Sequence, residues 1–139
     1  MSDTAYIALG SNLGDRNATL ARARQAVGEI NGIRVLRATE AEETAPVGPI
    51  AQGSFLNQML AVSTELSPRG LLAALQRIER AAGRIRTVRW GPRTLDMDIV
   101  LIEGVELSDD MLTVPHPELP NRDFWLRQLA ELRGVSDGQ

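Results

Sequence analysis

Leu95-Asp96-Met97-Asp98-Ile99-Val100-Leu101-Ile102 is the clearest strand in the chain. Acidic and apolar residues alternate in its first half and its second half is wholly apolar, as expected for a strand inside a sheet. The alternation predicts that Asp96 and Asp98 lie on one face, while the intervening apolar residues lie on the other. Glu103-Gly104 then predicts a hairpin turn, with Val105-Glu106-Leu107 as the returning strand.

The segments around this strand predict how the sheet is covered. In chain order they are a strand at 5–9, a helix with apolar residues from 20 to 30, a strand from 33 towards 44, a strand at 55–64, a helix at 67–82 and a final helix from 121 to 132. This order is the ferredoxin-like α+β pattern, an antiparallel sheet covered by helices, and we expect three α/β/α layers. We expect one domain over 1–139, with a flexible tail at 134–139. The fold alone does not identify a chemistry, because it carries enzymes, RNA-binding domains and regulatory domains.

The helices carry signals of their own. Ser67 can cap a helix whose first turn holds Pro68, which is a strong start signal. The residues of the final helix that we expect to face the core are Phe124, Leu126, Leu129 and Leu132.

The composition excludes several classes of function. The chain has 15 basic and 18 acidic residues, a net charge of -3, one histidine and no cysteine, and all 15 basic residues are arginine. Without cysteine or lysine there can be no thiolate nucleophile, Cys zinc site, Schiff base or Walker-type phosphate lysine. The acidic balance argues against general binding to nucleic acid or to anionic membranes. We see no secretory signal and no apolar stretch long enough to cross a bilayer, so we expect a cytoplasmic protein.

Asp96 and Asp98 form a pair of carboxylates in one small space. Their mutual repulsion is relieved by a cation, and hard oxygen ligands of this kind favour Mg²⁺, which adds waters and substrate phosphates. For an isolated pair of this kind, a solvated polar face at the sheet edge is the simpler explanation.

The stretch 84–93 before this strand holds four arginines and no acidic residue, although the chain is acidic overall. Guanidinium groups suit phosphate oxygens because they donate paired hydrogen bonds and keep their charge. A polyphosphate between this loop and an Asp96/Asp98-bound Mg²⁺ would balance both charge clusters. The alternative is a mobile, solvated basic loop that pairs with Glu79 or with the two aspartates.

Two further groups of residues suit ligands. The only histidine, His116, lies between two prolines and six residues before Arg122. Its position is compatible with a phosphate contact and equally with no role in binding. Phe55 and Asn57 point to one face at the start of their strand, and an aromatic ring beside an amide suits a flat heterocycle. Core packing is the simpler explanation for Phe55 alone.

Taken together, these segments resemble the 6-hydroxymethyl-7,8-dihydropterin pyrophosphokinase family, folate-pathway enzymes that move a pyrophosphate from ATP to a pterin alcohol. The resemblance runs from Tyr6 to about Glu131. Its most specific part is Gly83-Arg84 through Arg89-Trp90-Gly91-Pro92-Arg93-Thr94-Leu95-Asp96-Met97-Asp98-Ile99. Supporting blocks lie at 8–14, 44–48, 55–57 and 114–117, together with Asn121-Arg122 and Phe124.

The resemblance implies ATP as co-substrate and two Mg²⁺ ions held by Asp96 and Asp98 and bridged to the ATP phosphates. It implies that Arg84 and Arg93 engage the phosphates as their loop closes, so these four residues are the expected catalytic group. The ATP-binding residues that it implies are Leu72, Gln76, Glu79, Arg86, Trp90, Ile99, Thr113, His116 and Arg122. The pterin-binding residues that it implies are Thr44, Val47 through its backbone, Phe55, Asn57 and Phe124.

The chain departs from this family's pattern at a few places. Met111 stands where some members carry a basic residue near the nucleotide, and Ala45 replaces a proline found in some relatives. The C-terminus stops soon after Leu132, whereas longer members continue. None of these departures removes an expected metal ligand or phosphate arginine.

Two alternatives to an enzyme remain at this point. One is a binding module that holds nucleotide or pterin without turnover, and the other is an RNA-binding domain. RNA-binding sheets usually display clustered aromatic residues and a basic face, whereas aromatic residues are 4% of this chain and its charge is negative. We expect a monomeric enzyme whose partners are its two small-molecule substrates, with no nucleic acid and no membrane.

Overall fold

A five-stranded antiparallel sheet organises the protein, of which the computed structural model describes residues 2–45, 54–82 and 95–134. The strand order is β2–β4–β1–β5, and β3 also pairs with β4. The strands are β1 Asp3–Ser11, β2 Ile33–Ala38, β3 Glu42–Thr44, β4 Phe55–Thr64 and β5 Asp96–Ile102. The prediction of an antiparallel sheet is confirmed.

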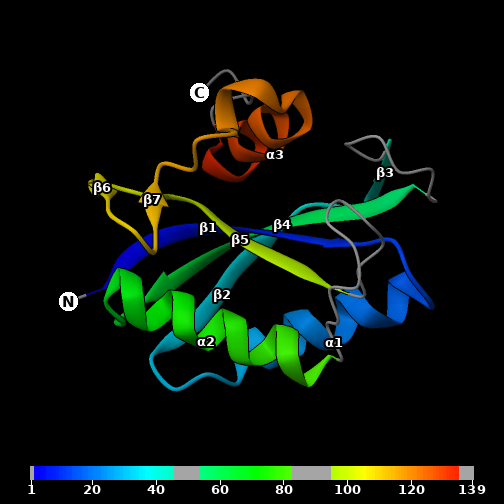
Figure 1. Ribbon diagram of the computed structural model, residues 1–139, viewed down its shortest axis with the longest axis horizontal. Helices are drawn as coiled ribbons and strands as arrows, with labels where there is room; N and C mark the ends of the chain where they lie inside the picture. The colour runs from blue at the N-terminus through cyan, green and yellow to red at the C-terminus, as the bar shows by residue number, and fades with distance from the viewer. Residues whose placement is uncertain (1, 46–53, 83–94, 135–139) are drawn as a thin grey trace.

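Helices cover both faces of this sheet. In Figure 1, α1 (Arg16–Gly28) and α2 (Pro68–Ala81) lie on one face, and α3 (Asp123–Arg133) lies on the other. Each interface has its own apolar cluster. The cluster beneath α1 and α2 includes Leu9, Leu20, Val27, Leu60, Leu71, Leu75, Met97 and Ile99. The cluster beneath α3 includes Tyr6, Ala8, Met59, Val100, Trp125, Leu129 and Leu132. The predicted three-layer, ferredoxin-like arrangement is therefore confirmed.

The helix ends follow ordinary capping chemistry. The Ser67 Oγ accepts a hydrogen bond from the Gly70 N–H at 3.0 Å, as its position before Pro68 predicts. At the other end of the chain, Gly134 closes α3 in the left-handed conformation with φ of 72°, which favours glycine. None of the helices in the described ranges is both long and apolar enough to cross a membrane.

The predicted hairpin after β5 is wrong. The outer neighbour of β5 is not the segment 105–107, because β6 (Leu107–Ser108) pairs with β7 (Thr113–Val114) instead. The chain then returns to β5 further on, where the backbone N–H of His116 donates to the Val100 carbonyl at 2.9 Å. This arrangement brings the histidine loop, rather than a second strand, to the outer edge of the strand with the two aspartates.

Two strand boundaries also differ from prediction. The expected strand from 33 towards 44 is split into β2 and β3, because Thr39 forms its own pair of bonds to Met59, as backbone donor at 3.0 Å and as hydroxyl acceptor at 3.0 Å. The first strand extends past Leu9 to Ser11, although Gly10 and Ser11 read as turn residues. Gly10 therefore lies inside the sheet.

The buried face of α3 is centred on Trp125, not on Leu126 as predicted. Trp125, Leu129 and Leu132 are buried, whereas 43% of Leu126 is exposed. Helical spacing places the residues at positions 125, 129 and 132 on one face, and their burial in one cluster shows that this face meets the sheet. A short 3-10 turn, η1 (Leu119–Asn121), precedes the helix.

Candidate active site

The two aspartates of β5 lie on the sheet face that α3 covers. Asp98 lies opposite Ala8 of β1, and Ala8 belongs to the apolar cluster beneath α3. Met97 and Ile99 are buried in the opposite cluster, as the alternation predicts. Both aspartates are partly exposed, so their carboxylates are held at the surface of the sheet next to a buried core.

Gly10 separates the amide of Asn57 from the carboxylate of Asp96. It pairs with Asn57 on β4 and with Asp96 on β5, so these three residues form one row across the sheet. A Cβ atom at Gly10 would lie 3.1 Å from the Asn57 Oδ1 and 3.6 Å from the Phe55 Cδ1. The missing side chain therefore lets the Asn57 amide and the Phe55 ring lie close to the backbone of β1. This role was not predicted, because the strand expected at 5–9 ends before Gly10.

The residues expected to contact a pterin begin at one end of that row. Thr44 of β3 lies opposite Phe55 of β4, and the Asn57 Nδ2 donates a hydrogen bond to the Thr44 Oγ1. Phe124 starts α3 on the same face, and its ring makes an edge contact with Trp125 at 6.3 Å between centroids. The structure thus brings Thr44, Phe55 and Asn57 together at one end of the sheet.

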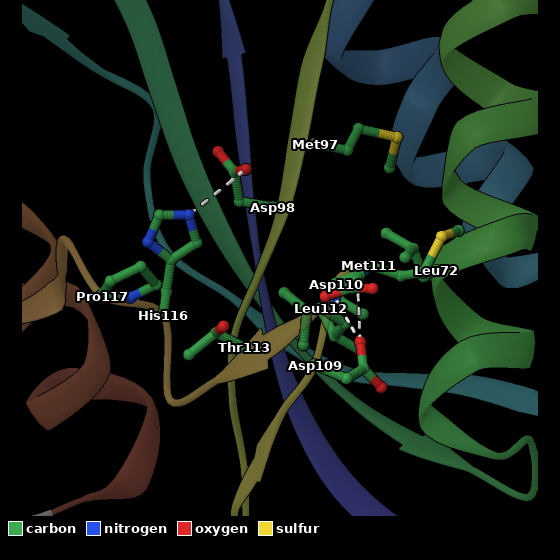
Figure 2. A pocket seen from close by; sticks show the side chains of 11 residues that line it. Leu72, Met97, Asp98, Asp109, Asp110, Met111, Leu112, Thr113, His116 and Pro117 are labelled. Atoms are coloured by element: carbon green, nitrogen blue, oxygen red, sulfur yellow. Dashed lines mark hydrogen bonds and ion pairs between the residues drawn. The ribbon is translucent and has the colours of Figure 1, made fainter.

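A cavity of about 280 Å³ lies beside the aspartates (Figure 2). Four of the expected ATP-binding residues line it, and so does Asp98. The complete lining is Leu72, Met97, Asp98, Ile99, Asp109, Asp110, Met111, Leu112, Thr113, His116 and Pro117. Gln76, Glu79 and Arg122 lie outside this lining.

His116 faces Asp98 from the loop that follows β7 (Figure 2). Its Nε2 lies 3.7 Å from the Asp98 Oδ1, and its Nδ1 accepts a hydrogen bond from the Glu118 N–H at 3.0 Å. Because the Nδ1 is an acceptor, the neutral ring carries its proton on the Nε2, on the side of the aspartate. The imidazole is therefore presented to the cavity as a hydrogen-bond donor.

Trp125 is a functional candidate that the sequence analysis missed. Its ring meets His116 edge-on, with 4.9 Å between centroids and 87° between planes. The Arg122 guanidinium carbon lies 4.3 Å from the centroid of the same ring. Its spacing from Leu129 and Leu132 was the signal that could have identified it as the anchor of α3.

Glu79 contacts the backbone of the aspartate strand. Its Oε2 accepts a hydrogen bond from the Met97 N–H at 2.7 Å, and Met97 lies between Asp96 and Asp98. The contact occupies a donor at the outer edge of β5, which would otherwise need water or another strand. The sequence indicated Glu79 only as a residue on the ATP side.

The turn that borders the cavity is organised by Asp109. Its Oδ1 accepts hydrogen bonds from the N–H groups of Met111 and Leu112 at 2.8 and 2.9 Å. Its Oδ2 pairs with the Arg69 Nη2 of α2 at 2.6 Å. These backbone bonds, followed by the Arg69 contacts, lower the pKa of the Asp109 carboxyl below its ordinary value.

The carboxylates fit Mg²⁺ as a partial ligand set. Within 2–45, 54–82 and 95–134 no group of three or more His, Cys, Asp or Glu side chains could hold a metal ion by itself. Asp96 and Asp98 share a face and supply hard oxygen atoms, and 40% of the Asp98 side chain is exposed. A protein site with one or two carboxylates, completed by water and substrate phosphate, is the usual arrangement for Mg²⁺.

Five expected site residues lie outside the described residues. They are Val47, Arg84, Arg86, Trp90 and Arg93.

Comparison with known proteins gives a consistent result over nearly the whole chain. Residues 6–134 match the family model described as 7,8-dihydro-6-hydroxymethylpterin-pyrophosphokinase. The 2-amino-4-hydroxy-6-hydroxymethyldihydropteridine pyrophosphokinase of Methylorubrum extorquens is 44% identical over 128 residues, which are 92% of this chain and 81% of that protein. The protein of the same name from Bacillus subtilis is 43% identical over 132 residues, 95% of this chain and 79% of that protein.

A solved structure supports the fold. The crystal structure of an HPPK-DHPS in complex with substrates is similar to this chain with a TM-score of 0.68, at 13% sequence identity. The similarity covers 94% of this chain and 40% of the other.

Proposed function

The chain belongs to the 7,8-dihydro-6-hydroxymethylpterin-pyrophosphokinase family, and on that premise we propose a role for each part of its site. The enzyme transfers pyrophosphate from ATP to the hydroxymethyl group of 6-hydroxymethyl-7,8-dihydropterin in folate biosynthesis. The products are AMP and the pterin pyrophosphate. The resemblance to this family that the sequence indicated is confirmed.

One observation carries the proposed geometry. The row Asn57–Gly10–Asp96 joins the group expected to read the pterin to the group expected to approach the phosphates, on one sheet face. Gly10, which has no side chain, lies between them, and the Asn57 amide and the Phe55 ring lie close to its backbone. A pterin alcohol held by Asn57 would therefore direct its hydroxymethyl group towards Asp96 and Asp98.

At the pterin end, we propose that Phe55 and Phe124 hold the faces of the ring, while Asn57 and Thr44 read its edge. An aromatic ring stacks well on flat heterocycles, and the hydrogen bond from Asn57 to Thr44 orients the amide. The backbone at Val47 is proposed to add a further edge contact.

At the nucleotide end, we propose that the adenine enters the cavity between Leu72, Ile99 and Thr113. His116 then faces the phosphates with its Nε2 proton. Arg122 is proposed to contact the phosphates as well. Further proposed ATP contacts are Gln76, Glu79, Arg86 and Trp90.

We propose that Asp96 and Asp98 hold two Mg²⁺ ions. When bound, these ions would neutralise phosphate charge and lower the electrostatic barrier to attack. The two carboxylates are fixed relative to each other because they lie two residues apart on one strand, and Glu79 holds the backbone between them.

In the proposed reaction, the pterin hydroxymethyl oxygen attacks the β-phosphorus of ATP. The new O–Pβ bond forms, the bond between the β-phosphorus and the bridging oxygen to the α-phosphate breaks, AMP leaves, and the hydroxyl proton is released. We propose that Arg84 and Arg93 stabilise the charge that develops on the transferred group. No side chain among the described residues is assigned as base for the proton, and a loose transition state does not require a strong one.

We also propose that the enzyme is monomeric and acts in the cytoplasm, where its co-substrate ATP is available. Light scattering after size-exclusion chromatography would show one chain per particle.

The proposed function is tested by AMP formation from ATP, Mg²⁺ and 6-hydroxymethyl-7,8-dihydropterin, with controls that omit pterin or metal. We expect AMP only when all three are present. ADP as product would mean that the γ-phosphorus is attacked, which contradicts the mechanism. Binding of ATP and pterin without any turnover would instead support a binding module.

A further inference from the structure

Trp125 contacts the two side chains proposed to meet the ATP phosphates from the α3 side. The exposed fraction of Trp125 is 2%, and the ring belongs to the apolar cluster beneath α3. His116 meets this ring edge-on at 4.9 Å, and Arg122 lies 4.3 Å from its centroid. One buried ring therefore touches a histidine from the loop after β7 and an arginine at the start of α3.

The two contacted side chains differ in how firmly they are otherwise held. His116 is fixed by its backbone bond to Val100 at 2.9 Å and by the Glu118 N–H on its Nδ1 at 3.0 Å. The Trp125 ring packs edge-on against this imidazole and adds a further restraint on its orientation. Arg122 has a long side chain with several rotamers, and the face of an indole attracts a guanidinium through its quadrupole. The Trp125 ring thus restricts the positions of both the Arg122 guanidinium and the His116 imidazole.

We propose that Trp125 is a positioning residue for the nucleotide phosphates. Its indole holds the His116 imidazole with the Nε2 towards Asp98, and it holds the Arg122 guanidinium on the same side of the sheet. Trp125 does not touch the substrate in this arrangement, since it lies beneath the two residues that do. The inference rests on the proposed function, because it takes from it the phosphate contacts of His116 and Arg122.

If Trp125 only packed in the core, its mutation should affect the enzyme in the same way as mutation of another core residue of α3. Leu129 lies one turn further along α3, is 6% exposed and belongs to the same cluster. Leu129→Ala therefore removes apolar packing beneath α3 while it keeps the Trp125 ring that contacts His116 and Arg122. It is a matched control for Trp125→Leu, which removes the ring but keeps an apolar side chain. Trp125→Phe keeps an aromatic face and should restore part of the effect.

Steady-state kinetics of the full chain separate the two roles. We expect Trp125→Leu to raise the KM for ATP by roughly fivefold to tenfold, with kcat and the KM for pterin changed by less than about threefold. Trp125→Phe should lie between Trp125→Leu and the wild type, and Leu129→Ala should leave the KM for ATP within about twofold of the wild type. An equal rise in the KM for ATP in Trp125→Leu and Leu129→Ala would overturn the proposal.

A double-mutant cycle and a spectrum distinguish failure of this inference from failure of the proposed function. If Arg122→Ala and His116→Ala raise the KM for ATP but Trp125→Leu does not, the phosphate contacts stand and the positioning role is wrong. If Trp125 acts through Arg122, the effects of Trp125→Leu and Arg122→Ala should not multiply in the double variant.

The spectrum does not depend on turnover. His116 is the only histidine, so its imidazole carbon-bound protons give one assignable set of NMR signals. At fixed pH in the free protein, Trp125→Leu should move these signals and Leu129→Ala should leave them in place. Unmoved His116 signals in Trp125→Leu would overturn the proposal even if the enzyme made AMP normally.

Discussion

Gly10 lies directly opposite Asp96 across the β1–β5 ladder, and its other neighbour in the row is Asn57. Because Gly10 has no side chain, only its backbone lies between the proposed pterin end and the proposed phosphate end of the row. A Cβ atom there would approach the Asn57 Oδ1 to 3.1 Å, which is closer than nearly all real contacts of this kind.

Gly10→Ala is therefore expected to damage pterin binding more than stability. The added methyl must displace the Asn57 amide, which is already bonded to Thr44, so we expect the KM for pterin to rise by roughly tenfold. The KM for ATP should change by less than about twofold. Gly28→Ala is the matched control, because a Cβ there meets only Val35 at 3.8 Å, an ordinary contact. A normal KM for pterin in Gly10→Ala would show that pterin binding does not depend on the contact between residue 10 and the Asn57 amide.

Mutation of the aspartate pair should lower turnover without lowering the melting temperature of the metal-free protein. Asp98→Asn removes one proposed Mg²⁺ ligand, so we expect turnover to fall by at least about a hundredfold. In EDTA the same substitution relieves repulsion from Asp96, so the melting temperature without metal should stay equal or rise. Asp3→Asn, at the exposed start of β1, is the control for loss of one negative charge. The comparison is made by thermal unfolding in EDTA and in Mg²⁺, and equal stabilisation of wild type and Asp98→Asn by Mg²⁺ would argue against this ligand.

Glu79 should act on catalysis through the backbone of β5. Glu79→Gln keeps an oxygen that can accept the Met97 N–H, whereas Glu79→Ala leaves that donor without its 2.7 Å partner. We expect Glu79→Ala to lower kcat by roughly tenfold and Glu79→Gln to retain most of it. Arg77→Ala, exposed on the same helix, serves as the control. If the glutamine and alanine variants are equally impaired, the charge of Glu79 matters and not its backbone contact.

The turn at Asp109 should make stability depend on pH at the acid end. The pKa of the Asp109 carboxyl is lowered from its ordinary value of 3.8, first by the backbone bonds from Met111 and Leu112 and then by Arg69. A carboxyl whose pKa is lower in the folded state stabilises the fold above its unfolded pKa, and the stabilisation is lost as pH falls through the folded pKa. Asp109→Ala should therefore lower the melting temperature at pH 7, and the difference from wild type should shrink as the pH falls below 3.8 and through the lowered pKa of the folded state. Asp110→Ala, at its exposed neighbour, is the control for the loss of one negative charge beside the same turn.

Local rules predicted the parts of the site that lie within one element. The alternation of β5 places Asp96 and Asp98 on one face because side-chain direction in a strand depends only on the count of residues. The cap at Ser67 was predictable for a similar reason, since a cap involves three neighbouring residues.

Contacts between distant elements could not be predicted in this way. The hydrogen bond from Met97 to Glu79 joins residues 18 positions apart, and nothing in either segment specifies the other. The hairpin prediction after β5 failed because the outer edge of that strand bonds to His116 instead. Trp125 was missed because Leu126 was placed on the buried face in its stead, although Trp125 shares helical spacing with Leu129 and Leu132.

Met111 offers a test of how charge in the cavity controls ATP affinity. Its side chain lines the cavity and is 62% exposed, and its neighbours Asp109 and Asp110 line the same space as Asp98. Apart from His116, the described charged side chains that line the cavity are the carboxylates of Asp98, Asp109 and Asp110. An arginine at position 111 would therefore add a positive charge to an acidic region, next to the proposed position of the ATP phosphates. Met111→Arg should lower the KM for ATP by roughly threefold to tenfold and leave the KM for pterin unchanged.

Met111→Leu separates charge from shape, because it keeps an apolar side chain of similar volume, and it should behave like the wild type. The gain from Met111→Arg should shrink as salt rises from about 0.05 to 0.5 M, since an exposed charge is screened. The measurement is the KM for ATP of the three proteins across that salt range. If Met111→Arg and Met111→Leu coincide at every salt concentration, the phosphates do not approach position 111. The adenine would then be the part of the nucleotide that passes this side chain, and the arginine would be neutralised by Asp109 or Asp110.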